Sequence, residues 1–208
     1  MHQHRNRRNM SSNRNQIMNE EQEPEPEQPI EFVLDDDVPS IPLQRHRSLL
    51  ASLMQITGES GAEISIALVR DAAIQAMNRN YRGVDSPTDV LSFCMREGET
   101  IGQAHLLGDI AISFDTASQQ AQDAQHDLAD ELDELLFHGF LHLLGYDHES
   151  DADRMQWLEA ERNLQSQLAD CELAFIPRGL LQYENRSFIE GGEQSASPTR
   201  EDRHDRTH

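Results

Sequence analysis

Residues 135–144, LLFHGFLHLL, form the segment that most restricts how this chain can fold. Nearly every position is apolar, and a helix that is apolar all round has to be buried. Gly145 follows directly. Glycine is preferred just past a helix end because it takes the left-handed conformation without a steric penalty. The segment therefore predicts a central helix that the rest of the domain covers, followed by a tight turn.

Two histidines interrupt this apolar helix, and a third follows the turn. His138 and His142 are four residues apart, so they lie on one face, one turn apart. The turn at Gly145 can bring His148 back to that face. A lone histidine in an apolar helix is usually a core residue with a satisfied hydrogen bond, but three that converge indicate a metal site for one ion, with Zn²⁺ preferred. Three ligands leave a fourth position for water, the pattern of a catalytic site.

The same spacing occurs in zinc peptidases, where a glutamate after the first histidine acts as general base. Gly139 stands at that position here. Metal activation of water can survive without this base, because bound zinc lowers the pKa of water to about 7. Gly139 permits either close packing on a sheet or room for a bulky substrate, and the sequence leaves both open. A structural zinc would instead need a fourth protein ligand, for which the candidates are Cys94, His105, His126 and Cys171.

Around the histidine helix, strand and helix patterns are mixed. Strands are predicted at 30–36, 62–69, 88–95 and 105–113, and helices at 43–55, 71–81, 115–144 and 151–168. We expect Asp71 to cap the second helix, and Gly58 and Gly83 to end the first two. Because strands and helices do not alternate strictly, the expected fold class is α+β (mixed α/β). It would be a single small mixed sheet packed with helices, with the metal site on a buried central helix and the turn after it.

Both ends of the chain are polar. Residues 1–29 end in a Pro/Glu-rich segment, and the last residues are rich in Gly, Ser and charge, so neither end can bury enough apolar surface to fold. We expect a disordered extension at 1–29, one domain at 30–182 and a disordered tail at 183–208. No apolar run is long enough to span a membrane, and the N-terminus lacks the apolar core of a secretory signal. Two cysteines favour a reducing cytoplasm.

The formal net charge of −21 opposes a broad nucleic-acid-binding surface. A polyanionic substrate would need a local cationic site, and the loop NRNYRGVDSPTDVLSF at 78–93 offers one. Arg82 could hold a phosphate in its planar fork beside the metal. The alternative is a surface ion pair with Asp85 or Asp89.

Six acidic residues lie just upstream of His138, and they bear on any phosphate-binding role. We expect most of them to form a solvated helix start, although any that faced the metal would repel a phosphate. Glu134, one turn before His138, is also a candidate hydrogen-bond partner for that histidine. The six are Asp123, Asp127, Asp130, Glu131, Asp133 and Glu134.

Three stretches, NRNYRGVDSPTDVLSF, LLGDIAIS and HGFLHLLGYDH, together resemble the YbeY family of bacterial endoribonucleases. The resemblance implies metal-dependent, single-strand-specific RNA cleavage in maturation of the 16S ribosomal RNA 3′ end and in ribosome quality control. It also implies zinc ligands at His138, His142 and His148 and a functional arginine at Arg82. The family's Leu-Gly-Asp step falls on Asp109, which could orient a histidine ligand by accepting its second N–H or could serve only the turn.

Three functions therefore stand side by side. The favoured one is a zinc endoribonuclease whose partners are single-stranded rRNA and the ribosome or its proteins, with no membrane partner. The second is a zinc peptidase-like hydrolase. The third is a non-catalytic ribosome assembly factor, whose zinc holds the fold and whose acidic surface meets basic ribosomal proteins.

Overall fold

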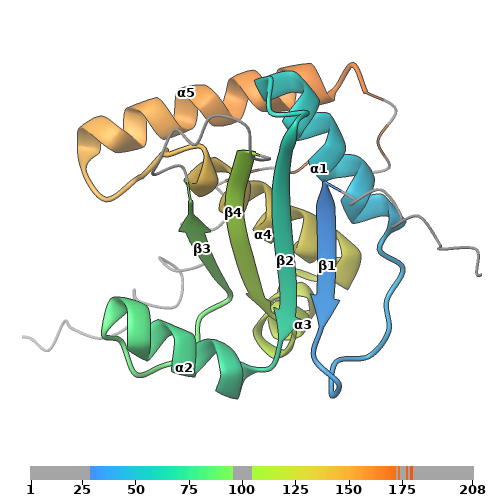
Figure 1. Cartoon of the computed structure of the whole chain (residues 1–208), viewed down its shortest axis with the longest axis vertical. Helices are drawn as coiled ribbons and strands as arrows, with labels where there is room; N and C mark the ends of the chain where they lie inside the picture. The colour runs from blue at the N-terminus through green and yellow to red at the C-terminus, as the bar shows by residue number, and fades with distance from the viewer. Residues whose placement is uncertain (1–28, 96–104, 172, 174–176, 178, 180–208) are drawn as a thin grey trace, which may run out of the picture.

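A computed structural model describes residues 29–95, 105–171, 173, 177 and 179 of the chain. It contains one four-stranded mixed sheet with helices packed on it, which confirms the α+β class (Figure 1). The extension expected at 1–29 lies outside the described residues except for Pro29, and the tail expected at 183–208 lies wholly outside them.

The sheet has the strand order β1-β2-β4-β3. The strands are β1 (Ile30–Leu34), β2 (Ala62–Val69), β3 (Val90–Cys94) and β4 (His105–Ser113). β1, β2 and β4 are parallel, whereas β3 pairs antiparallel with β4 and forms one edge. The parallel pairs follow from the helices between them, because a parallel connection requires a crossover.

The described residues form five helices, which are α1 (Gln44–Thr57), α2 (Asp71–Arg82), α3 (Phe114–Ala124), α4 (Leu128–Leu143) and α5 (Asp151–Leu168). Three of these five, α1, α2 and α5, begin and end close to the predicted positions. Gly58 and Gly83 end α1 and α2 in the left-handed conformation, as expected. The predicted cap at Asp71 was wrong: Arg70 is the cap, and Asp71 is the first helical residue. Its carboxylate accepts hydrogen bonds from Ser113 and Thr116, which ties α2 to α3.

The single helix predicted at 115–144 was also wrong, because two helices cover this range. Gln125 takes a left-handed conformation with φ of 55°, and α4 begins after Asp127. The His126 backbone N–H still bonds back to the Ala121 carbonyl. The side chain of His126 then pairs with Glu131 in α4. The break contains neither glycine nor proline, the residues that usually end a helix, so the sequence does not indicate where the first helix stops.

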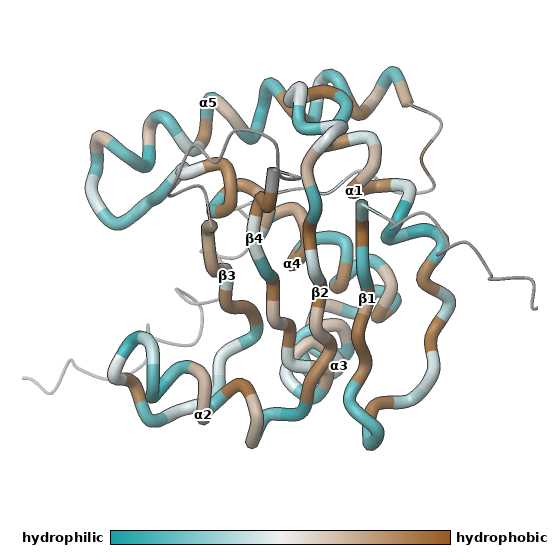
Figure 2. Tube along the Cα trace, in the orientation of Figure 1, coloured by the Kyte–Doolittle hydropathy of each residue, from teal (hydrophilic) through white to brown (hydrophobic). Residues whose placement is uncertain are grey.

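The α4 helix lies behind the sheet and packs on β3 and β4, while α2 packs on the opposite face of the same strands (Figure 1). Apolar residues run along the strands and α4, where Leu135, Phe137, Phe140 and Leu141 are almost completely buried (Figure 2). This confirms the buried central helix. Among the described residues, none of the helices combines the length and apolar character needed to cross a bilayer.

Three of the six acidic residues are buried, so the expectation of a solvated helix start was wrong for them. Asp133 pairs with Arg45 and His46 of α1, at 2.7 and 2.6 Å. Glu131 pairs with His126, and the Glu134 carboxylate accepts a hydrogen bond from the Gly179 backbone N–H at 3.0 Å. These carboxylates anchor neighbouring segments to α4.

Candidate metal centre

The three predicted histidines converge in the folded chain. One ring nitrogen from each of His138, His142 and His148 lies within 4.8 Å of the others, and no further His, Cys, Asp or Glu of the described residues joins this group. The Nε2 atoms of His138 and His142 are 3.2 Å apart. Two imidazole ligands on a tetrahedral zinc ion, each at about 2.05 Å, would place their nitrogens about 3.3 Å apart. The donor set therefore fits a zinc ion.

The end of α4 brings the third histidine into place. Gly145 has φ of +89°, and Tyr146 donates its backbone N–H to the Leu141 carbonyl at 3.1 Å. The chain thus reverses immediately after the helix, as the glycine predicted. The Tyr146 carbonyl in turn accepts a hydrogen bond from Nδ1 of His142 at 3.1 Å. That bond fixes the tautomer in which Nε2 carries a free lone pair for a metal.

Trp157 of α5 packs against all three histidines. Its ring centroid lies 4.8 Å from each of the three imidazole centroids, and its side chain is fully buried. Among the described residues, none accepts a hydrogen bond from its indole N–H. In the sequence, Trp157 is simply one of the apolar positions of the helix predicted at 151–168. It is the only tryptophan in the chain, and this was the one sign in the sequence that it could belong to the site.

Burial keeps two of these histidines neutral. It lowers the pKa of His138 to about 3, with the neighbouring His142, His148 and Arg82 contributing in the same direction. Burial also lowers the pKa of His142, followed by the effect of His148. Since only neutral imidazole binds metal, burial holds these two ligands in the binding form.

The histidines line a cavity of about 500 Å³ together with Arg82. The predicted alternative for Arg82, an ion pair with Asp85 or Asp89, does not form. Arg79 forms an ion pair with Asp85 at 3.6 Å instead. The Asp89 carboxylate accepts hydrogen bonds from the Val90 N–H and the Gln120 side-chain amide. Within the described part of the chain, no ion pair occupies the Arg82 guanidinium. It is therefore available to an anion at the histidines.

Gly139 serves close packing, which decides between its two predicted roles. A Cβ at this position would lie 3.0 Å from two carbons of Ile110 and from Ser92 Oγ. Ser92 also donates its hydroxyl to the Gly139 carbonyl at 3.2 Å. The position that carries the peptidase glutamate thus faces the sheet and has no room for a longer side chain.

Asp109 lies away from the histidines. It pairs with Phe93 across β3 and β4, whereas the next pair, Ser92 and Ile110, faces α4. Side chains alternate between faces along a strand, so the Asp109 carboxylate points to the opposite side of the sheet. It lines a second cavity there with Tyr81. The predicted role of Asp109 in orienting a histidine ligand is therefore corrected.

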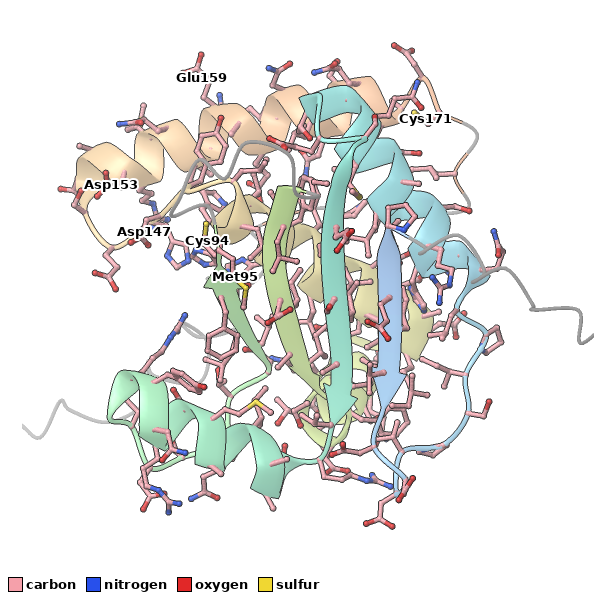
Figure 3. The ribbon with its side chains drawn as sticks, in the orientation of Figure 1. Cys94, Met95, Asp147, Asp153, Glu159 and Cys171 are labelled. Carbon is pink, nitrogen blue, oxygen red and sulfur yellow. The ribbon has the colours of Figure 1, made fainter. Side chains whose placement is uncertain are left out.

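The residues predicted as candidates for a fourth metal ligand do not join the three histidines. The Cys94 thiol donates to the Leu143 carbonyl at 3.3 Å, His126 pairs with Glu131, and Cys171 is a free thiol just after α5. The side chain of His105 is outside the described set. The acidic residues that do line the histidine cavity are Asp89, Asp147 and Glu149. Figure 3 shows Asp147 on the loop between α4 and α5.

Comparison with known proteins places the chain among related sequences. The family model described as Endoribonuclease YbeY matches residues 35–169. An endoribonuclease YbeY of Moorella thermoacetica is 50% identical over 117 residues, covering 53% of this chain and 74% of the relative. That of Desulfitobacterium hafniense is 45% identical over 126 residues, covering 57% and 80%.

Two further matches differ from these in coverage or in identity. An endoribonuclease YbeY of an Anaeromyxobacter species is 49% identical over 120 residues, which cover 57% of this chain and 62% of the relative's length. A solution structure of a Thermotoga maritima protein aligns with a TM-score of 0.44 at 21% identity, covering 80% of this chain and 99% of that protein.

Proposed function

The chain belongs to the endoribonuclease YbeY family, and from this premise we propose that it is a zinc-dependent endoribonuclease that cleaves single-stranded RNA. The observation that carries the proposal is the shared cavity of Arg82 and the three histidines. A metal site and a guanidinium that no described residue pairs with line the same cavity. Together they suit a phosphodiester, because both interact with phosphoryl oxygens.

The residues divide the chemistry between them. His138, His142 and His148 would hold the ion, which when bound acts as a Lewis acid and lowers the pKa of a coordinated water. Arg82 binds the scissile phosphate and stabilises the negative charge that develops on it. The Tyr146 carbonyl and Trp157 hold the imidazoles in place. Whether water or the 2′-hydroxyl of the RNA is the nucleophile is decided by the cleavage products, a 5′-phosphate or a 2′,3′-cyclic phosphate.

Cleavage of a single-stranded rRNA fragment tests this proposal. We expect Arg82→Ala to lower kcat by about 10²- to 10³-fold, the usual loss when one transition-state donor is removed. Arg79→Ala is the matched control, because Arg79 lies on the same helix and pairs with Asp85 outside the cavity. His142→Ala should abolish cleavage together with metal content. Equal rates in wild type, Arg82→Ala and His142→Ala would refute the proposal.

We further propose that the substrate is ribosomal RNA, with the 16S 3′ end as the site of maturation, and that the enzyme takes part in ribosome quality control. Its partners would then be the ribosome or its proteins, and its place the cytoplasm, which suits the two free thiols. Mapping of 16S 3′ ends in cells that carry His142→Ala in place of the wild type tests this role. Correctly trimmed ends would contradict it.

The domain boundaries are likewise a proposal. The family match at 35–169 supports one domain at 30–182 with extensions at 1–29 and 183–208 that contribute no ligand. A chain reduced to 30–182 should keep its zinc and its cleavage rate. Loss of zinc on truncation would show that the domain is larger.

The two alternative functions make different predictions. A peptidase needs a general base beside His138, and Gly139 packs on Ile110 there, so no chelator-sensitive cleavage of casein is expected. A non-catalytic assembly factor would lose thermal stability on chelation but would leave RNA intact at every metal concentration. RNA cleavage that depends on Arg82 excludes both.

A further inference from the structure

A second cavity opens on the other face of the sheet, and the proposed function does not use it. This groove of about 450 Å³, called here the sheet-face groove, lies between α2 and the exposed face of β1, β2, β4 and β3. Its lining is mostly apolar and includes Val33, Met77, Tyr81, Phe93 and Met95. Tyr81 is 72% exposed and Met95 is 44% exposed. Asp109 is the only charged residue among the described residues that line it.

The sheet-face groove adjoins the histidine cavity across the edge strand β3. Ser92 lines the histidine cavity, and the next residue, Phe93, lines the groove. In the same way Arg82 lines the cavity, and the preceding residue, Tyr81, lines the groove. Figure 3 shows Cys94 and Met95 at the end of β3, and the Cys94 thiol bonds to the Leu143 carbonyl at the end of α4. A polymer whose phosphate is held by Arg82 can therefore pass round this edge.

The chemistry of the groove suits a nucleobase. The Tyr81 and Phe93 rings meet edge to face, with centroids 4.9 Å apart and an angle of 65°, and the exposed Tyr81 ring offers a surface for stacking. Single-stranded RNA is recognised mainly by stacking of unpaired bases on aromatic side chains. A volume of about 450 Å³ matches a small-molecule site. A protein partner would need a much larger surface, about 800 Å² on each side.

The carboxylate of Asp109 suits one base better than the others. Its side chain is half-buried at the wall of the groove, and no other side chain of the described residues bonds to its carboxylate. An ionised carboxylate only accepts hydrogen bonds. Guanine alone presents two adjacent donors, N1–H and the 2-amino group, on its Watson–Crick edge. The other bases place at least one acceptor beside each donor, which a carboxylate would repel.

We propose that the sheet-face groove binds an unpaired guanine next to the phosphate held at the histidine cavity, stacked on Tyr81 and bonded to Asp109. This proposal rests on the proposed function, since it names the base that the same enzyme would recognise in its RNA substrate. It also explains how a chain with a net charge of −21 binds a polyanion, because a base brings no charge into the groove. Affinity then comes from stacking, with few phosphate contacts.

Binding of uncleaved RNA separates this proposal from the proposed function. The probe is a short single-stranded RNA with 2′-O-methyl riboses, labelled for fluorescence anisotropy, titrated with the full metal-loaded chain and checked for integrity by gel. One probe carries guanosine at the test position, and matched probes carry inosine, which lacks the 2-amino group, adenosine or uridine. Binding is measured whether or not the chain cleaves RNA, so a failed cleavage assay leaves this test intact.

We expect the wild type to bind the guanosine probe about 10-fold more tightly than the inosine probe, as for one lost hydrogen bond to a charged group. Asp109→Asn should remove this preference. Tyr81→Ala should weaken all probes by about 5- to 150-fold, the range for base–aromatic stacking. Glu159→Gln and Met155→Ala, exposed positions on α5, are the matched controls and should bind like the wild type.

Equal binding of guanosine and inosine probes by the wild type would overturn the proposed base preference. Wild-type affinity in Tyr81→Ala would overturn the stacking site itself. If that variant instead lost a basic protein partner while binding RNA normally, the groove would belong to a protein interface and the proposal would be wrong.

Discussion

Acidification of the metal-free protein should destabilise it through His138, and the size of the effect follows from the structure. Burial lowers the pKa of His138 from 6.5 to about 3. In the unfolded chain the imidazole regains its ordinary pKa of about 6.5. Between these two values the unfolded state binds a proton that the folded state does not, so stability falls as the pH falls through this window.

The magnitude at pH 5.5 comes from the two pKa values. At this pH the unfolded imidazole is mostly protonated and the folded one is almost wholly neutral. The linkage relation then gives a loss of about 1.4 kcal/mol relative to pH 8, or about a tenfold change in the folding equilibrium. The lowered pKa of His142 adds to the loss in the same direction. A pH of 5.5 also stays above the isoelectric point of about 4.6, where low net charge would promote precipitation.

Urea unfolding at pH 8 and pH 5.5, after removal of metal by chelation, provides the measurement. Carboxylates also titrate over part of this range, so the informative quantity is a difference between proteins. We expect the loss of unfolding free energy between the two pH values to be smaller in His138→Gln than in wild type by about 1.4 kcal/mol. The same pH dependence in both proteins would refute the argument that burial holds His138 neutral.

Other predictions concern the metal, the helix packing and the tryptophan. Zinc should raise the melting temperature of the wild type and restore its stability at pH 5.5, because only the folded chain presents three converged ligands. In calorimetry, His142→Ala should show neither response. Co²⁺ or Cu²⁺ should quench the fluorescence of Trp157, because the ring of this sole tryptophan lies 4.8 Å from each imidazole. If emission did not change when these ions were titrated in, the metal would bind elsewhere. Gly139→Ala should lower the unfolding free energy by about 1–2 kcal/mol in urea unfolding, because the new methyl group would contact Ile110 and Ser92. A gain in stability would mean that these two side chains move aside without cost. Trp157→Leu should weaken zinc affinity by about 10-fold, the lower end of the loss seen when groups behind the ligands are altered, and calorimetric titration with zinc would show it.

The sequence alone determined the central helix and its histidines. An apolar stretch must be buried wherever the domain places it, and spacing of four puts His138 and His142 on one face in any α-helix. Gly145 fixed the reversal that returns His148, because a left-handed residue at this point turns the chain regardless of its surroundings. These features depend on contacts within a few turns of the chain, so local pattern was enough to predict them.

Contacts between distant segments decided the rest. The acidic residues before His138 have the composition of a solvated helix start, yet Asp133 is buried because Arg45 and His46, remote in sequence, pair with it. The face on which Asp109 lies depends on the register of β4 against β3, and no local pattern records that register. Trp157 reaches the imidazoles only because α5 packs across them. Within the described residues Arg82 forms no ion pair, because other side chains occupy its candidate partners, Asp85 and Asp89. In each case the deciding interaction joins residues whose closeness exists only in the folded chain.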